Sequence, residues 1–163
     1  MSGEPGANTM AETAESRLNA LGIVLPTPPA PAANYVPSVI AGKLLFASGQ
    51  ISVLPGGAKF IGKLGRDFSV EQGREAARIC AINLLANFKT TLGDLEKVRR
   101  VVKLTGFVNS IGDFDEPHKV VNGCSDLLTD VLGERGKHAR SAISVASLPL
   151  GAAVEVEAIV EIA

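Results

Sequence analysis

The chain has 163 residues, 46% of them hydrophobic and 20% charged, which fits about one globular domain and excludes a disordered or collagen-like protein. Sixteen basic residues against seventeen acidic ones leave a formal net charge of −1. The chain has no basic excess, and its aromatic side chains are only six Phe and one Tyr. Nucleic acid is therefore disfavoured as the main partner.

The two cysteines, Cys80 and Cys124, stand in apolar surroundings without CxxC spacing, so neither a disulfide framework nor a zinc site is indicated. Free buried thiols fit a reducing compartment. No apolar run is long enough to cross a membrane, and residues 1–8 lack the pattern of a secretory signal. We therefore expect a cytoplasmic protein with no metal and no membrane contact.

Residues 1–32 are expected to form a loose tail, a short helix and a Pro-rich connector that precede a domain of residues 33–163. Thr9 and Glu12 have the spacing of a capping box, and apolar residues then recur at helical spacing as far as Leu21. Pro26, Pro28, Pro29 and Pro31 follow, which predicts a stiff, extended connector.

The domain opens with two apolar runs, Val39–Ile40 and Leu44–Ser48, whose separation by three residues predicts a hairpin. A glycine-rich loop follows, and Gly62-Lys63-Leu64 lacks the Ser or Thr of a phosphate-binding loop, so we interpret it as a flexible connection. A long amphipathic helix is expected to begin after Ser69, which forms a capping box with Gln72, and to end at Gly93.

The rest of the chain predicts a strand over 101–108, a helix over 115–132 closed by Gly133, and strands over 139–147 and 153–162. The order ββαβαββ indicates an α+β fold in which two helices cover one face of a mixed sheet. The other face, carrying Glu155, Ile159 and Phe107, would be half polar and half apolar. Solvent or a second subunit could cover such a face, and we favour an oligomer.

Standard catalytic motifs are absent from the sequence. His118 and His138 are expected to be solvated surface residues, and the cysteines to be small buried apolar groups. Arg140 and Glu155 remain as candidates. An arginine fork can hold a carboxylate or phosphate, and a glutamate can accept protons or orient a water. The alternative is a plain Arg–Glu ion pair across strands of an exposed sheet face.

Four blocks, in matching order and spacing, resemble the Rid family of reactive-intermediate deaminases, also called YjgF/YER057c/UK114: Leu45-Phe46-Ala47-Ser48-Gly49-Gln50, Ala139-Arg140-Ser141, Leu148-Pro149 and Val154-Glu155-Val156-Glu157-Ala158. The resemblance covers residues 33–163 and is to the longer, N-terminally extended branch. It implies a chorismate-mutase-like α+β fold assembled as a homotrimer, with a small carboxylate-bearing ligand in each of three clefts between subunits.

For deaminating members, the resemblance implies hydrolysis of imines and enamines such as 2-aminoacrylate to a 2-keto acid and ammonia, with no metal or organic cofactor. By position, Arg140 matches the arginine that holds the substrate carboxylate and Glu155 the acid that positions water. The cleft-lining positions match Tyr35, Ser48, Gly49 and Asn122. Ala142 stands where many deaminating members have Cys. A non-catalytic trimeric carboxylate-binding or regulatory protein is the alternative, and ribonuclease or translation inhibition is disfavoured by the charge.

Overall fold

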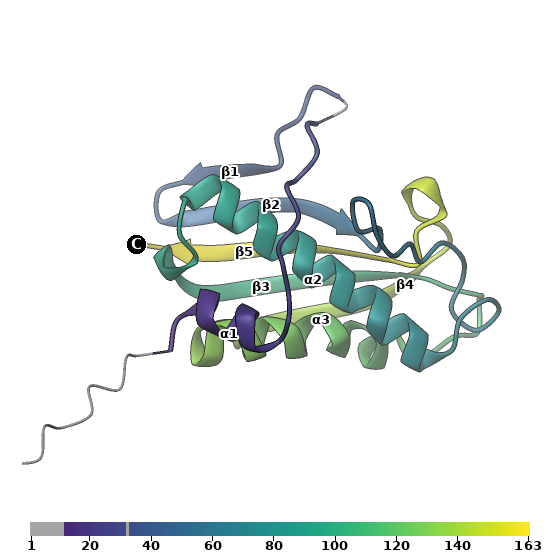
Figure 1. Cartoon of the computed structure of the whole chain (residues 1–163). Coiled ribbons are helices and arrows are strands. Elements are labelled where there is room, and N and C mark those ends of the chain that lie inside the picture. The colour runs from purple at the N-terminus through teal and green to yellow at the C-terminus, as the bar shows by residue number, and fades with distance from the viewer. Residues whose placement is uncertain (1–11, 32) are drawn as a thin grey trace, which may run out of the picture.

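The computed structural model describes residues 12–31 and 33–163 (Figure 1). Within these residues, five strands form one mixed sheet in the spatial order β1-β2-β5-β3-β4, in which β3–β4 is the parallel pair. The expected order ββαβαββ behind an N-terminal helix is confirmed. The elements are α1 (Ala14–Ala20), β1 (Ser38–Ala41), β2 (Leu44–Ile51), α2 (Val70–Leu92), η1 (Leu95–Lys97), β3 (Val98–Asn109), α3 (Pro117–Leu132), η2 (Gly133–Gly136), β4 (Ala139–Val145), η3 (Pro149–Gly151) and β5 (Val154–Ile162).

Helices α2 and α3 lie side by side on one face of the sheet, as Figure 1 shows, and the main core fills the space between them and the strands. The predicted capping box of α2 is present: the Ser69 hydroxyl accepts from the Gln72 N–H, and the Gln72 side chain accepts from the Ser69 N–H. Gly93 ends α2 with a φ of 83°, a conformation that favours glycine.

Several element ends differ from the sequence prediction, and three of the differences have a direct cause. Helix α3 begins at Pro117, two residues later than expected, because proline suits the first helical position. Strand β3 begins at Val98 because its pairing with β5 extends to Ile162. Strand β4 ends at Val145, where its partner β3 ends.

The two faces of the sheet differ as the alternation in β5 predicts. Val154, Val156 and Val160 are fully buried under the helices, whereas Glu155 and Glu157 point to the opposite, open face. Large apolar side chains also lie on this open face: Phe46 is 42% exposed, Ile143 46% and Val39, which pairs with Phe46, 53%. The open face is therefore partly apolar.

We call residues 12–31 the N-terminal arm. Its helix α1 is capped by Thr13, whose side chain accepts from the Ser16 N–H. The predicted capping box is therefore misplaced: Thr9 lies outside the described residues, and Glu12 precedes the helix and accepts a bond from the Arg17 side chain. Apolar residues of α1, Ala14 and Leu18, are buried.

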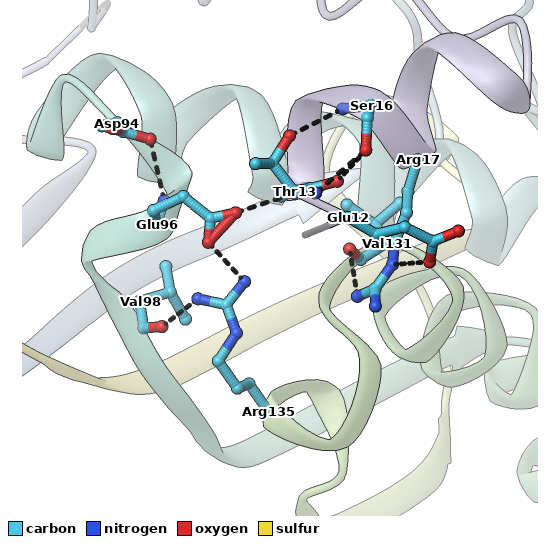
Figure 2. A network of polar contacts seen from close by, with 10 residues as sticks. Glu12, Thr13, Ser16, Arg17, Asp94, Glu96, Val98, Val131 and Arg135 are labelled. Atoms are coloured by element: carbon cyan, nitrogen blue, oxygen red, sulfur yellow. Dashed lines mark hydrogen bonds and ion pairs between the residues drawn. The ribbon is translucent and has the colours of Figure 1, made fainter. Parts of the chain in front are cut away.

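Figure 2 shows how polar contacts fix this arm to the domain. The Glu96 carboxylate accepts one bond from the Ala14 N–H at 2.8 Å and another from Arg135 at 2.9 Å. Arg17 donates to the carbonyl of Val131 in α3. Beyond α1 the arm runs across α2 toward β1 (Figure 1).

No helix in residues 12–31 or 33–163 is long and apolar enough to cross a membrane.

Candidate functional site

Four of the residues singled out in the sequence line one cavity of about 310 Å³ at the edge of the sheet: Tyr35, Ser48, Gly49 and Glu155. The cavity exists because β1 pairs with β2 only as far as Ala47. The Ser48 N–H still donates to the carbonyl of Pro37, but in the described part of the chain no strand pairs with the outer edge of β2 beyond it. The register of β2 against β5 also shifts between Ala47 and Gln50. The unpaired strand end and the irregularity open the sheet beside Glu155.

Gly49 makes room for the Glu155 carboxylate. A Cβ atom at Gly49 would lie 2.2 Å from Glu155 Oε1, so only glycine permits this close approach. Glu155 is half-buried, and the loss of water contact, followed by the charge of Glu157, raises its pKa. A carboxylate of raised pKa in a cavity is suited to proton transfer.

Arg140 belongs to a second cluster, between β4 and α3. Its Nη1 donates to Asn122 Oδ1 at 2.9 Å and to Ser125 Oγ at 3.2 Å, and its Nη2 donates to the carbonyl of His118 at 3.2 Å. A guanidinium has five N–H donors, so two remain after these three bonds: the Nε–H and one N–H of Nη2. The cluster thus orients the group and leaves donors for an anion.

His138 completes this cluster. Its Nδ1 lies 2.6 Å from the carbonyl of Gly136 and must donate to it, so in the neutral ring Nε2 accepts from the Ser125 hydroxyl at 2.9 Å. Burial lowers the pKa of His138, and Arg140 lowers it further against the opposing effect of the Gly136 bond. The expectation of a solvated His138 is therefore wrong, because α3 packs against the start of β4. His118 is exposed, as predicted.

The single chain does not bring Arg140 and Glu155 together. Arg140 pairs with Leu104 of β3, and Leu104 is fully buried under the helices. The Arg140 side chain accordingly points to the helix-covered face, where it contacts Asn122 of α3. Glu155 pairs with Phe107, which is three residues further along β3 than Leu104. Because side chains alternate between the two faces of a sheet, residues three positions apart on a strand point to opposite faces. The two groups thus lie on opposite faces, and the Arg–Glu pair across strands considered above does not form within one chain.

The sequence reasoning missed two parts of the site. Ser125 follows Asn122 by three residues on a helix, and His138 precedes Arg140 by two residues, just before β4 begins, so their spacing could have placed them beside the predicted residues. The other missed part is the far wall of the Glu155 cavity, which is formed by the four consecutive residues 28–31 of the N-terminal arm together with Leu150. Leu150 has a φ of 59°, which is strained for leucine, and its side chain is 79% exposed.

Neither cysteine takes part in the site. Both Cys80 and Cys124 are fully buried, as predicted, and burial raises the pKa of Cys124 to about 12. No three His, Cys, Asp or Glu side chains of residues 12–31 and 33–163 come together in a group that could hold a metal ion.

Comparisons with known proteins match nearly the whole chain. A model of the family described as "YjgF/chorismate mutase-like, putative endoribonuclease" matches residues 15–162. Protein TCP17 of Trypanosoma cruzi is 49% identical over 148 residues, 90% of this chain and 92% of that protein. The crystal structure of Atu1372 of Agrobacterium tumefaciens, a protein of unknown function, is 50% identical, with a TM-score of 0.86 over 92% of both chains. A Shewanella oneidensis MR-1 structure that carries the same endoribonuclease description is 35% identical, with a TM-score of 0.89 over 93% of this chain and 100% of the other.

Proposed function

Because this chain belongs to the YjgF/YER057c/UK114 family, also called the Rid family, we propose that it hydrolyses 2-imino acids and their enamine tautomers, such as 2-aminoacrylate, to 2-keto acids and ammonia. The observation that carries this proposal is the pair of complementary groups. One is a half-buried Glu155 in a cavity with Tyr35, Ser48 and Gly49. The other is an oriented Arg140 with two N–H donors left for an anion.

Arg140 holds the substrate carboxylate. A fork of two parallel N–H bonds fits a planar carboxylate, and the bonds to Asn122, Ser125 and His118 fix the plane of the guanidinium before the substrate arrives. A pre-oriented group loses less entropy on binding, so the anchor contributes to positioning as well as to affinity.

Glu155 positions the attacking water. Water adds to the imine carbon while its proton passes to Glu155, the electron pair of the C=N bond moves to nitrogen, and Glu155 passes that proton to the nitrogen, which gives a neutral carbinolamine. Glu155 then takes the hydroxyl proton of the carbinolamine as the C=O bond forms and gives it to the departing nitrogen, which leaves as ammonia. An imine conjugated to a carboxylate is already electrophilic, so the reaction needs orientation and proton transfer, with no activated nucleophile.

The complete site requires two copies of the chain, since Arg140 and Glu155 lie on opposite faces of the sheet. The partly apolar open face with Phe46, Ile143 and Val39 supports an assembly in which a neighbouring copy covers it. We propose the homotrimer that the family resemblance implies, in which Arg140 of one copy and Glu155 of the next share each cleft.

The test is keto-acid formation from freshly generated 2-aminoacrylate, measured as acceleration over the protein-free rate, with semicarbazide competing for the imine. We expect acceleration by the wild type and none by Arg140→Ala. A folded wild-type oligomer that accelerates no imine would overturn the deaminase proposal. Carboxylates that raise its melting temperature would then identify a binding protein, whereas RNA binding that weakens steeply with salt would identify a nucleic-acid function.

A further inference from the structure

A second cavity, of about 320 Å³, lies under the N-terminal arm beside the Glu155 cavity. The two cavities share four lining residues: Pro28, Pro29, Gln50 and Ile51. The rest of the second lining is mainly apolar and comprises Pro26, Val53, Pro55, Asn83 and Ala86. The arm and the end of β2 therefore form a common wall from the Glu155 carboxylate to an apolar chamber.

Both ends of the Pro-rich segment are tied to the domain. At its start, α1 is held by Glu96 (Figure 2) and by the ion pair of Glu15 with Lys89 of α2 at 2.6 Å. Past its end, the carbonyl of Pro37 accepts from Asn87 Nδ2 at 3.0 Å and from the Ser48 N–H at 2.9 Å. Prolines restrict the backbone between these ties, so the arm is a stiff wall.

The polar side chains of the second cavity are largely engaged by the protein. Asn83, which is 8% exposed, donates both amide hydrogens of Nδ2 to the carbonyls of Ile51 and Val53, at 3.1 and 3.0 Å. Gln50 donates through Nε2 to the carbonyl of Ser48 at 3.2 Å. What the cavity offers a ligand is mainly apolar surface, the usual lining of a site that binds a small apolar group.

We propose that the second cavity is the subsite for the substrate side chain, and that it selects 2-imino acids with branched or extended apolar side chains. This inference rests on the proposed function, which places the reacting carbon beside Glu155. The side chain of 2-aminoacrylate is a single methylene and leaves the second cavity empty. Each further methylene of the side chain that moves from water into the second cavity should raise kcat/KM roughly fourfold. The N-terminal arm is thereby a specificity-determining element.

The experiment compares kcat/KM for imines generated by an amino-acid oxidase from alanine, norvaline, leucine and phenylalanine. With the wild type we expect kcat/KM to rise at least tenfold from the alanine-derived to the leucine-derived imine. Val53→Trp, which fills the second cavity and does not line the first, removes that gain, so the ratio of kcat/KM for the leucine-derived imine to that for the alanine-derived imine falls to about one. Ala86→Leu fills the same cavity from α2 and gives the same pattern if Val53→Trp fails to fold.

The matched control is Val24→Trp, an equally large change at a 91% exposed residue of the same arm that lines neither cavity. It leaves both rates unchanged. A wild type indifferent to side-chain length, or a Val53→Trp variant that lowers all imines equally, overturns the subsite. If no imine is hydrolysed, the proposed function fails, and calorimetric Kd values of the matching 2-keto acids test the subsite alone. Affinity that rises with chain length in the wild type and not in Val53→Trp supports it; no such rise overturns it.

Discussion

Arg140 and Glu155 lie on opposite faces of the same sheet, because their pairing partners on β3, Leu104 and Phe107, are three residues apart. Arg140 faces α3, and Glu155 opens into the cavity at the edge of β2. A reaction that uses both groups on one small substrate therefore has to take them from different copies of the chain.

Shared sites predict complementation between inactive variants. Arg140→Ala and Glu155→Gln are each expected to be inactive alone. Co-expressed in equal amounts, they form mixed oligomers in which a site has an intact Arg140 from one variant and an intact Glu155 from the other in about a quarter of cases. Keto-acid formation should therefore return to about a quarter of the wild-type rate. Mixed oligomers with no activity would show that both groups act within one chain.

Gly49→Ala should disable Glu155 without unfolding the protein. The added Cβ would meet the Glu155 carboxylate, the movable end of a flexible side chain, so that carboxylate shifts and the backbone stays. A displaced catalytic group costs on the order of 100-fold in kcat. The control is Gly112→Ala, at a glycine whose added Cβ meets nothing within 4 Å. Full activity of Gly49→Ala would contradict the role of Glu155.

Glu155→Gln should lose activity and gain stability at neutral pH. The pKa of Glu155 in the folded chain is raised above 4.5, so the folded state holds its proton more tightly than the unfolded state does. The free energy of unfolding consequently falls as pH rises from 4.5 through the raised value. Glutamine removes this penalty, so thermal melts should place the variant at or above the wild type at pH 7, with no advantage below pH 4.5. A variant less stable than the wild type at pH 7 would contradict this sign.

The pH dependence contributed by His138 has the opposite direction. Its pKa in the fold lies below 6.5, so the unfolded state binds more protons between that lowered value and 6.5. Stability from this group is present above pH 6.5 and is lost as pH falls through the window. We expect His138→Gln to flatten the melting temperature between pH 5 and 7. The chain has two histidines, so the proton NMR signal that disappears in His138→Gln identifies the His138 ring, whose titration can then be followed in the wild type. A His138 midpoint at or above 6.5 would contradict this direction.

The difference between what could and could not be predicted from sequence is clear at β4 and β5. In β5 strict alternation of Val with Glu reveals the face of Glu155. In β4 the small residues around Arg140 carry no such pattern. The face to which Arg140 points therefore depends on the register of β4 with β3, and that pairing joins residues far apart in the sequence. The prolines of the arm predict stiffness, yet nothing local to them encodes that they wall a cavity beside Glu155.

A charged substitution on the open face should both separate the subunits and abolish activity. Phe46 lies on that face, where it pairs with Ile159 of β5 and is 42% exposed in a single chain. A carboxylate placed there and buried against a neighbour would cost several kcal/mol per subunit. We expect Phe46→Glu to have the mass of a monomer by light scattering and to form no keto acid. The control is Val24→Glu, at a 91% exposed residue of the arm, which should keep the wild-type mass and rate. An active monomeric Phe46→Glu variant would show that one chain suffices for the site, and a monomeric wild type would contradict the proposed homotrimer.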